Sequence, residues 1–239
     1  METKFERVPT GIPGLDSMIE GGFKRNNTIL VVGGCGSGKS TLAMQYLYYG
    51  AMHGENGVYV TFEEEPEQIR ENMSRHGWDI RAAEKAGKLK ILRVDPQDVM
   101  HVIGEEYGSI VDTINDMKAR RVVVDSLTTV ETMIKDDFEK RQQTLKLIKW
   151  LQKTNCTNIM IAEAEQDPTH YSRYGIVEFV VDGVIVLYNL RRGKIRLRAL
   201  EVLKMRGTKQ TTNLVPYVIE NGIQLQPHQV IFGDVGGEQ

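Results

Sequence analysis

Residues 33–41 (GGCGSGKST) carry side chains and glycines of the kind that bind phosphate groups. They match G-x-x-x-x-G-K-[ST] without a mismatch, between an apolar strand pattern and a helix pattern. Glycines let the backbone turn through positive φ, so that N–H groups of the loop and of the following helix point at one anion. Lys39 could then reach the β- and γ-phosphates, and Ser40 could ligate Mg²⁺. The alternative is a glycine-rich turn with an incidental lysine.

We therefore expect a nucleoside triphosphate with its Mg²⁺ to bind at this loop. The residues expected to contact it are Gly34, Cys35, Gly36, Ser37, Gly38, Lys39, Ser40 and Thr41.

Asp125 is the acid expected to complete the metal site with Ser40. It ends the run 121–125 (RVVVD), whose apolar character is typical of a central strand in a parallel sheet. At the end of such a strand a carboxylate can hold the Mg²⁺ that bridges the phosphates. The alternative is that Asp125 caps the helix that follows it.

Glu63 and Glu64 follow a second apolar run, 58–62. Ligands of open parallel sheets bind outside the carboxyl ends of the strands, so one of these carboxylates could orient the water that attacks the γ-phosphate. The alternative is structural, because acids just before Pro66 favour the start of a helix.

The segment 191–209 is rich in Lys and Arg, with Glu201 as its one acid. Many of these charges could serve to keep a strand edge from pairing with another chain. Lys204 and Arg206 differ, because residues two apart on a strand point to the same side and can converge on one anion. If a neighbouring subunit's nucleotide lies there, they would stabilise transition-state charge in trans.

The elements that must position these residues alternate between strand and helix patterns as far as residue 163. Strands are predicted at 28–33, 58–62, 89–94, 121–125 and 158–163, and helices at 38–52, 66–76, 80–86, 99–118 and 138–153. This alternation predicts an α/β fold with a mostly parallel sheet flanked by helices. Strand patterns at 180–188, 194–205 and 214–220 lack helices between them, which predicts antiparallel strands at one edge.

The 239 residues favour one domain, with 1–27 packing on the core and 226–239 as an irregular tail. The net charge of −2 gives no general attraction to nucleic acid or an anionic membrane. The chain has no long apolar run and no signal-peptide pattern, so we expect a cytoplasmic protein. Two cysteines, Cys35 and Cys156, are too few for a disulfide framework.

The stretch 164–175 has no core periodicity and is predicted to be a loop. Gln166 could sense the γ-phosphate there, or do nothing. Tyr171, Arg173 and Tyr174 interleave aromatic and basic residues as single-strand-binding loops do, but the acids around them argue against nucleic acid.

Several motifs together resemble the KaiC family within the RecA-like ATPases. They are TGIPGLD with EGGF (10–23), GGCGSGKST (33–41), VYVTFEEEPEQI (58–69), VVVDSLTTV (122–130), YGIVEFVVDGVIVL (174–187) and ALEVLKMRGTKQ (199–210). The resemblance implies a RecA-like core that binds ATP or ADP with Mg²⁺ at the subunit interfaces of a ring, usually a hexamer. It also implies that Glu63 activates water with Glu64 as its partner, and that Lys204 and Arg206 reach a neighbour's γ-phosphate.

Two departures limit what the resemblance implies. The chain has one core where the clock protein has two in tandem, so timekeeping is not implied. Gln210 stands where the family often has His. The leading hypothesis is a slow, oligomeric, regulatory ATPase that signals to an unidentified protein partner. The alternatives are a recombination ATPase that forms filaments on DNA, as RadA-like relatives do, and a nucleotide-dependent switch with negligible hydrolysis.

Overall fold

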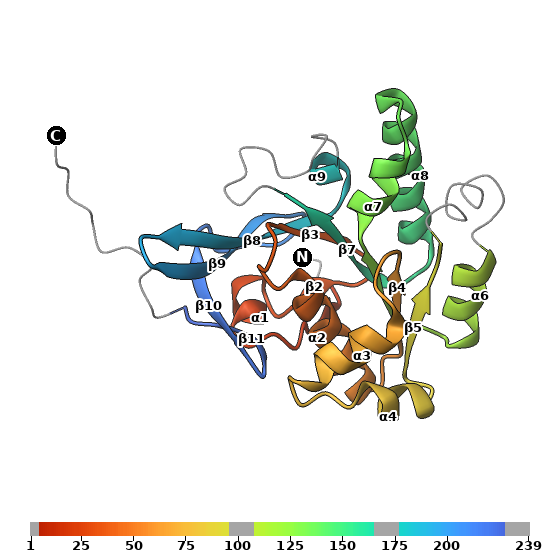
Figure 1. Ribbon diagram of the computed structural model, residues 1–239, viewed down its shortest axis with the longest axis horizontal. Coiled ribbons are helices and arrows are strands. Elements are labelled where there is room, and N and C mark those ends of the chain that lie inside the picture. Colours follow the sequence, from red (N-terminus) through yellow and green to blue (C-terminus); the bar gives the residue numbers. More distant parts are fainter. Residues whose placement is uncertain (1–4, 96–107, 165–176, 228–239) are drawn as a thin grey trace.

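The computed structural model describes residues 5–95, 108–164 and 177–227 (Figure 1). Its strands are β1 (Arg7–Val8), β2 (Phe23–Lys24), β3 (Thr28–Gly33), β4 (Gly57–Thr61), β5 (Leu89–Arg93), β6 (Arg121–Asp125), β7 (Thr157–Glu163), β8 (Gly183–Arg192), β9 (Ile195–Met205), β10 (Val215–Glu220) and β11 (Gly222–Leu225). Its helices are α1 (Leu15–Met18), α2 (Lys39–Met52), α3 (Pro66–Ser74), α4 (Ile80–Lys85), α6 (Gly108–Asp116), α7 (Leu127–Met133), α8 (Asp137–Lys153) and α9 (Val177–Val180).

Within the described residues, nine strands form one sheet in the order β11-β10-β9-β8-β3-β7-β6-β4-β5. The six strands from β8 to β5 are parallel to one another, and β9, β10 and β11 are added antiparallel. The predicted α/β fold, mostly parallel with an antiparallel edge, is confirmed.

The antiparallel part begins one strand later than its sequence pattern suggests. The strand pattern from residue 180 predicts an antiparallel addition, but β8 pairs in parallel with β3. Parallel neighbours need a crossover of a dozen or more residues, and the chain between Glu163 and Gly183 is long enough to provide one. Antiparallel pairing starts at the β8–β9 turn.

Helices cover both faces of the sheet because its central strands are apolar on both sides. In β3, Ile29 and Val31 belong to one core cluster, and Leu30 and Val32 belong to the other. The first cluster includes residues of α1 to α4, and the second includes residues of α6 to α9 (Figure 1). Packing on both faces therefore holds the ends of the central strands in place.

Several element boundaries differ from the predictions. The strand predicted from residue 180 begins later, at Gly183, because the short helix α9 ends at Val180, and the described part of the helix predicted at 99–118 contains α6. The short elements α7 and β11 were not predicted. β11 follows β10 through one tight turn at Gly222, whose φ is 103°, and its four residues are too few to show a period.

Candidate functional site

The loop between β3 and α2 lies at the carboxyl end of the central strand. Gly36 and Gly38 have φ of 71° and 89°, the left-handed region that glycine tolerates. A Cβ on Gly38 would lie 2.6 Å from Ile219 Cδ1, and one on Gly33 would lie 2.4 Å from the Leu187 carbonyl oxygen. The close packing explains the glycines, and α2 begins directly after the loop with its N–H groups directed at it.

Two side chains, one from β8 and one from β10, hold this loop in place. The Tyr217 hydroxyl of β10 donates to the Ser37 carbonyl at 2.5 Å, and Asn189 Nδ2 of β8 donates to the Cys35 carbonyl at 3.2 Å. Burial raises the pKa of Tyr217, so its hydroxyl stays a donor. The loop backbone is thus held in place from β8 and β10.

Lys39 lies inside the loop. Its ammonium donates to the carbonyl oxygens of Gly33 and Gly34 at 2.8 and 3.1 Å. Burial lowers the pKa of Lys39, although the charges of Glu163 and Asp125 act in the opposite direction. A cation whose hydrogen-bond acceptors are backbone carbonyls can exchange them for phosphate oxygens at small cost, because charged acceptors bind it more strongly.

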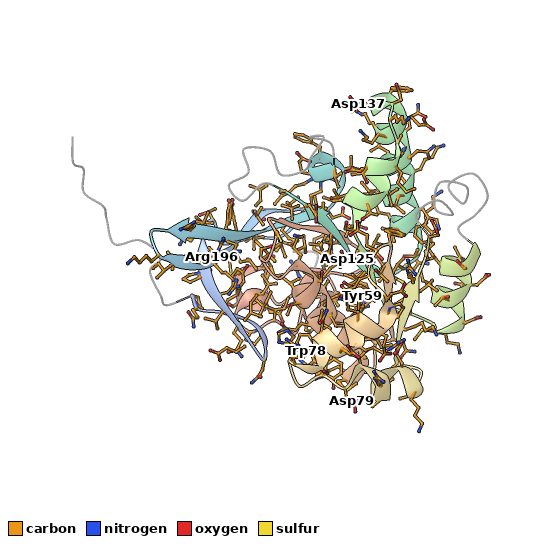
Figure 2. The ribbon with its side chains drawn as sticks, viewed as in Figure 1. Tyr59, Trp78, Asp79, Asp125, Asp137 and Arg196 are labelled. Atoms are coloured by element: carbon orange, nitrogen blue, oxygen red, sulfur yellow. The ribbon has the colours of Figure 1, made fainter. Side chains whose placement is uncertain are left out.

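Ser40 and Asp125, predicted to hold Mg²⁺, meet in the structure although 85 positions separate them. The Ser40 hydroxyl donates to Asp125 Oδ2 at 2.8 Å, and the Tyr59 hydroxyl donates to the same oxygen at 2.5 Å. Figure 2 labels Tyr59 and Asp125. Burial raises the pKa of Asp125, and the two hydroxyls and the charge of Lys39 only partly oppose this. A largely buried carboxylate whose direct partners are neutral hydroxyls fits a divalent cation.

The alternative role for Asp125, capping the next helix, does not match its contacts. Ser126 is the N-cap residue of α7, and the two hydrogen bonds to the Asp125 carboxylate come from Ser40 and Tyr59. The carboxylate therefore faces the start of α2.

Glu63 and Glu64 point to different elements. Glu63 Oε1 accepts a hydrogen bond of 2.6 Å from Thr129 in α7, and Thr129 in turn contacts the Ser126 hydroxyl at 3.0 Å. Glu64 Oε1 accepts one of 2.9 Å from Asn72 in α3. Burial raises the pKa of Glu64, the Asn72 hydrogen bond opposes this, and the charge of Asp125 raises it further. Of the two acids, Glu63 is thus the one hydrogen-bonded to the segment that follows β6.

Lys204 and Arg206 both point at the end of α9, in keeping with their spacing. Lys204 Nζ donates to the carbonyl oxygens of Glu178 and Val181 at 2.9 and 2.7 Å. Arg206 Nη2 donates to the Phe179 carbonyl at 2.7 Å. Burial lowers the pKa of Lys204, and the nearby charge of Arg206 lowers it further.

Sheet register places this pair of cations far from the chain's own phosphate loop. Met205 pairs with Gly183 in β8, and Gly183 pairs with Ile29 at the start of β3. The loop follows Gly33 at the other end of β3, about 13 Å away at the usual rise per residue of a strand. The pair cannot complete the site of its own chain in this conformation.

Other predicted residues have simpler outcomes. Gln166, Tyr171, Arg173 and Tyr174 lie outside the described residues. Gln210 donates to the Val202 carbonyl at 2.8 Å. Both cysteines are free thiols, Cys35 exposed and Cys156 buried. In the ranges that the structure describes, no helix has both the length and the apolar character needed to cross a membrane.

The residues that support the site are not among those predicted from the sequence. They are Tyr59, Asn72, Thr129, Asn189 and Tyr217. A signal existed for Tyr59, since a tyrosine inside an apolar strand needs a hydrogen-bond acceptor for its hydroxyl. The others show no signal, because their partners depend on which elements become neighbours.

Known proteins share both the sequence and the fold. The family model "ATPase: KaiC" matches residues 8–230. The circadian clock protein KaiC3 of Synechocystis sp. is 37% identical over 235 residues, covering 95% of this chain and 46% of that protein. The circadian clock oscillator protein KaiC of Thermostichus vulcanus is 35% identical over 229 residues, covering 93% and 44%. The chain thus spans less than half the length of these relatives.

A solved structure shares the whole fold. The crystal structure of a KaiC-like protein from the hyperthermophilic archaeon Pyrococcus horikoshii OT3 superposes with a TM-score of 0.84 at 36% identity, covering 94% of this chain and 100% of that one. On the sequence match and on this superposition, the chain belongs to the KaiC family of RecA-type ATPases.

Proposed function

We propose that this chain is a Mg²⁺-dependent ATPase that converts ATP and water to ADP and phosphate, and that it works as a homo-oligomer, in a ring of six by analogy with its family. The observation that carries the proposal is the meeting of Ser40 and Asp125 at the first turn of α2, beside the phosphate loop. Because the acid is largely buried, a cation brought by the nucleotide would relieve a cost already present in the fold.

Binding would use the loop and the start of α2. The N–H groups of residues 34–41 would hold the phosphates, and Lys39 would exchange its two carbonyl acceptors for β- and γ-phosphate oxygens. Ser40 and Asp125 would hold Mg²⁺, which neutralises charge on those phosphates when bound.

Glu63 is the better candidate to orient the attacking water. Thr129 holds its carboxylate on the side of α7, beyond the end of β6. Among the described residues the side-chain hydrogen bond to Glu63 ends on Oε1, so Oε2 would accept from water. Glu64, whose carboxylate is directed to Asn72, would act as its partner.

Lys204 and Arg206 would act on the nucleotide of a neighbouring subunit. Their place at the far end of β3 from the loop supports a role in trans. An isolated subunit would then hydrolyse ATP slowly. With clock proteins among the similar sequences, we propose a regulatory role in the cytoplasm that acts on a protein partner.

The test compares Lys204→Ala/Arg206→Ala with wild-type protein. Mass in solution is measured with and without Mg²⁺-ATP, and phosphate release is followed at high protein concentration. We expect the variant to bind ATP and turnover to fall by about 10³-fold, the usual effect of losing such cations. Arg196→Ala, in the same basic segment, is the matched control and should keep wild-type turnover.

A double variant that assembles and keeps full turnover would contradict the role in trans. If wild-type protein binds Mg²⁺-ATP and releases no phosphate, the nucleotide-dependent switch is the correct function instead.

A further inference from the structure

Tyr59 is hydrogen-bonded to a residue of the candidate metal site, yet its side chain has no contact with solvent. It is in the middle of β4, and its side chain is fully buried. Its hydroxyl donates to Asp125 Oδ2 at 2.5 Å, and Figure 2 shows the two residues side by side near the middle of the molecule.

Two hydroxyls converge on one oxygen of this carboxylate. Ser40 Oγ donates to Asp125 Oδ2 at 2.8 Å, alongside Tyr59. Two donors on one oxygen fix the rotation of the carboxylate about its Cβ–Cγ bond. In the described part of the chain, the side-chain hydrogen bonds that Asp125 accepts both end on Oδ2. Oδ1 is therefore the oxygen presented to a metal or to a metal-bound water.

Strand register explains why the phenol arrives there. Thr61 pairs with Asp125, and Tyr59 lies two residues earlier on the same face of β4. That face packs on α2, which carries Ser40 at its second residue. Phenylalanine would fill the same apolar space, so packing alone does not account for the hydroxyl.

We propose that Tyr59 is a positioning residue whose hydroxyl holds the Asp125 carboxylate in the rotation that presents its other oxygen to the Mg²⁺ of Mg²⁺-ATP. The proposal rests on the proposed function, because it needs Mg²⁺-ATP to bind at Ser40 and Asp125. Losing a hydrogen-bond partner of a metal ligand typically costs 10- to 100-fold in metal affinity. Binding of metal-free ATP would be unaffected, because the hydrogen bond that Tyr59 donates goes to Asp125, and Asp125 would meet the nucleotide through the metal.

The test is Tyr59→Phe, with Tyr46→Phe as the matched control. Tyr46 is equally buried on the same side of the sheet, but its hydroxyl donates to the Thr157 carbonyl at 3.0 Å, away from the site. Calorimetry gives the affinity for ATP in EDTA and in Mg²⁺, and phosphate release gives the Mg²⁺ concentration for half-maximal activity.

We expect Tyr59→Phe to raise that Mg²⁺ concentration about 10-fold, to lose about the same factor in the affinity for Mg²⁺-ATP, and to keep the wild-type affinity for ATP in EDTA. Tyr46→Phe should match wild type in all three. Unchanged Mg²⁺ dependence in a folded Tyr59→Phe, or an equal change in both variants, would overturn the proposal. If wild-type protein itself shows no binding of Mg²⁺-ATP, the proposed function fails instead.

A second measurement needs no folded variant at position 59. In wild-type protein with ¹³Cζ-labelled tyrosine, the resonance that moves in Asp125→Asn should also shift when Mg²⁺ is added to the ATP-bound protein. A Tyr59 resonance that ignores Mg²⁺ would overturn the proposal.

Discussion

Strand β6 carries a charged residue at each end, fully buried at Arg121 and partly exposed at Asp125, and the two ends satisfy that charge in different ways. At the amino end, the Arg121 guanidinium is 1% exposed, pairs with Glu55 at 2.6 Å, donates to the Tyr46 carbonyl at 2.9 Å and lies over the Tyr46 ring. At the carboxyl end, the side-chain hydrogen bonds that the Asp125 carboxylate accepts within the described residues come from the hydroxyls of Ser40 and Tyr59. The charge at the amino end is thus paired with an opposite charge, and the charge at the carboxyl end is hydrogen-bonded to neutral hydroxyl groups.

The pKa directions of the two acids express the same difference. Burial acts against the ionised Glu55, but hydrogen bonds and charges from Arg25 and Arg121 outweigh it, so the pKa of Glu55 is lowered. At Asp125 burial outweighs the hydroxyl donors and the charge of Lys39, so the pKa is raised. A buried charge with complete ionic partners supports the fold, whereas one held by neutral donors beside a helix N-terminus is suited to a ligand.

Removing the fixed partner at the amino end should give the largest effect. Glu55→Ala leaves Arg121 buried without its counter-ion, which typically costs about 3–5 kcal/mol of unfolding free energy. Urea denaturation measures the loss. Glu6→Ala is the control, because Glu6 also pairs with Arg25 but is 67% exposed, and should cost about 0–1 kcal/mol. If Glu55→Ala lost less than about 1 kcal/mol of unfolding free energy, the ion pair at the amino end of β6 would not have the structural role assigned to it.

The equivalent change at the carboxyl end should affect turnover and leave stability intact. Asp125→Asn removes the charge that would hold Mg²⁺, and we expect phosphate release to fall at least about 100-fold, equivalent to about 2.7 kcal/mol of transition-state stabilisation. Its unfolding free energy should equal or exceed that of wild type. The control is Asp136→Asn, at the N-cap of α8, where Asn caps equally well. If Asp125→Asn kept wild-type turnover, or lost as much stability as Glu55→Ala, the role of Asp125 would be structural.

Adding an atom next to Arg121, at the amino end of β6, should have a smaller effect on stability. A Cβ on Gly50 in α2 would lie 2.4 Å from Arg121 Nε. Overpacking costs about 1–3 kcal/mol and the better helix propensity of Ala returns part of it, so Gly50→Ala should lose about 1 kcal/mol of stability with unchanged nucleotide affinity. Gly108→Ala should change little, because among the described residues no atom outside its own helix and chain neighbours lies within 4 Å of the added Cβ. Denaturation and ATP titration of both variants provide the check.

The smallest effect is the pH dependence of stability, which should have opposite signs at the two ends. The lowered pKa of Glu55 means that its ionised carboxylate stabilises the fold above pH 4.5. This stabilisation is lost as pH falls through the pKa of Glu55 in the folded state. The raised pKa of Asp125 means that ionisation costs stability at neutral pH, and that this cost disappears as pH falls toward 3.8.

Denaturation between pH 7 and pH 4 separates the two terms. As pH falls, the unfolding free energy of wild type should decrease relative to that of Glu55→Gln. Over the same range it should increase relative to that of Asp125→Asn. Parallel changes in both pairs would contradict the assigned directions.

The carboxyl end of β6 was the easier end to predict from sequence. Ser40 and Asp125 each follow an apolar strand pattern, and parallel strands bring their carboxyl ends to one edge, so their meeting could be expected. The amino end gave no such signal, because a basic residue at the start of a strand is usually exposed. Nothing in the sequence around Arg121 indicates that Glu55 will face it.

The rest of the site depends on neighbours that only the folded sheet defines. Tyr59 reaches Asp125 because β4 lies beside β6, and Thr129 reaches Glu63 because α7 follows β6 at once. The parallel pairing of β8 with β3 likewise placed Lys204 far from the chain's own loop. Such pairings are set by strand order, which a local pattern does not contain.

Titration calorimetry of ATP into wild-type protein and into Asp125→Asn, each with Mg²⁺ and with EDTA, tests the central claim most directly. We predict that Mg²⁺ tightens ATP binding to wild type at least about 10-fold and that Asp125→Asn loses this gain while still binding ATP. No binding by wild type, or an affinity that Mg²⁺ changes equally in both proteins, would contradict the claim that the carboxyl end of β6 is a site for Mg²⁺-ATP.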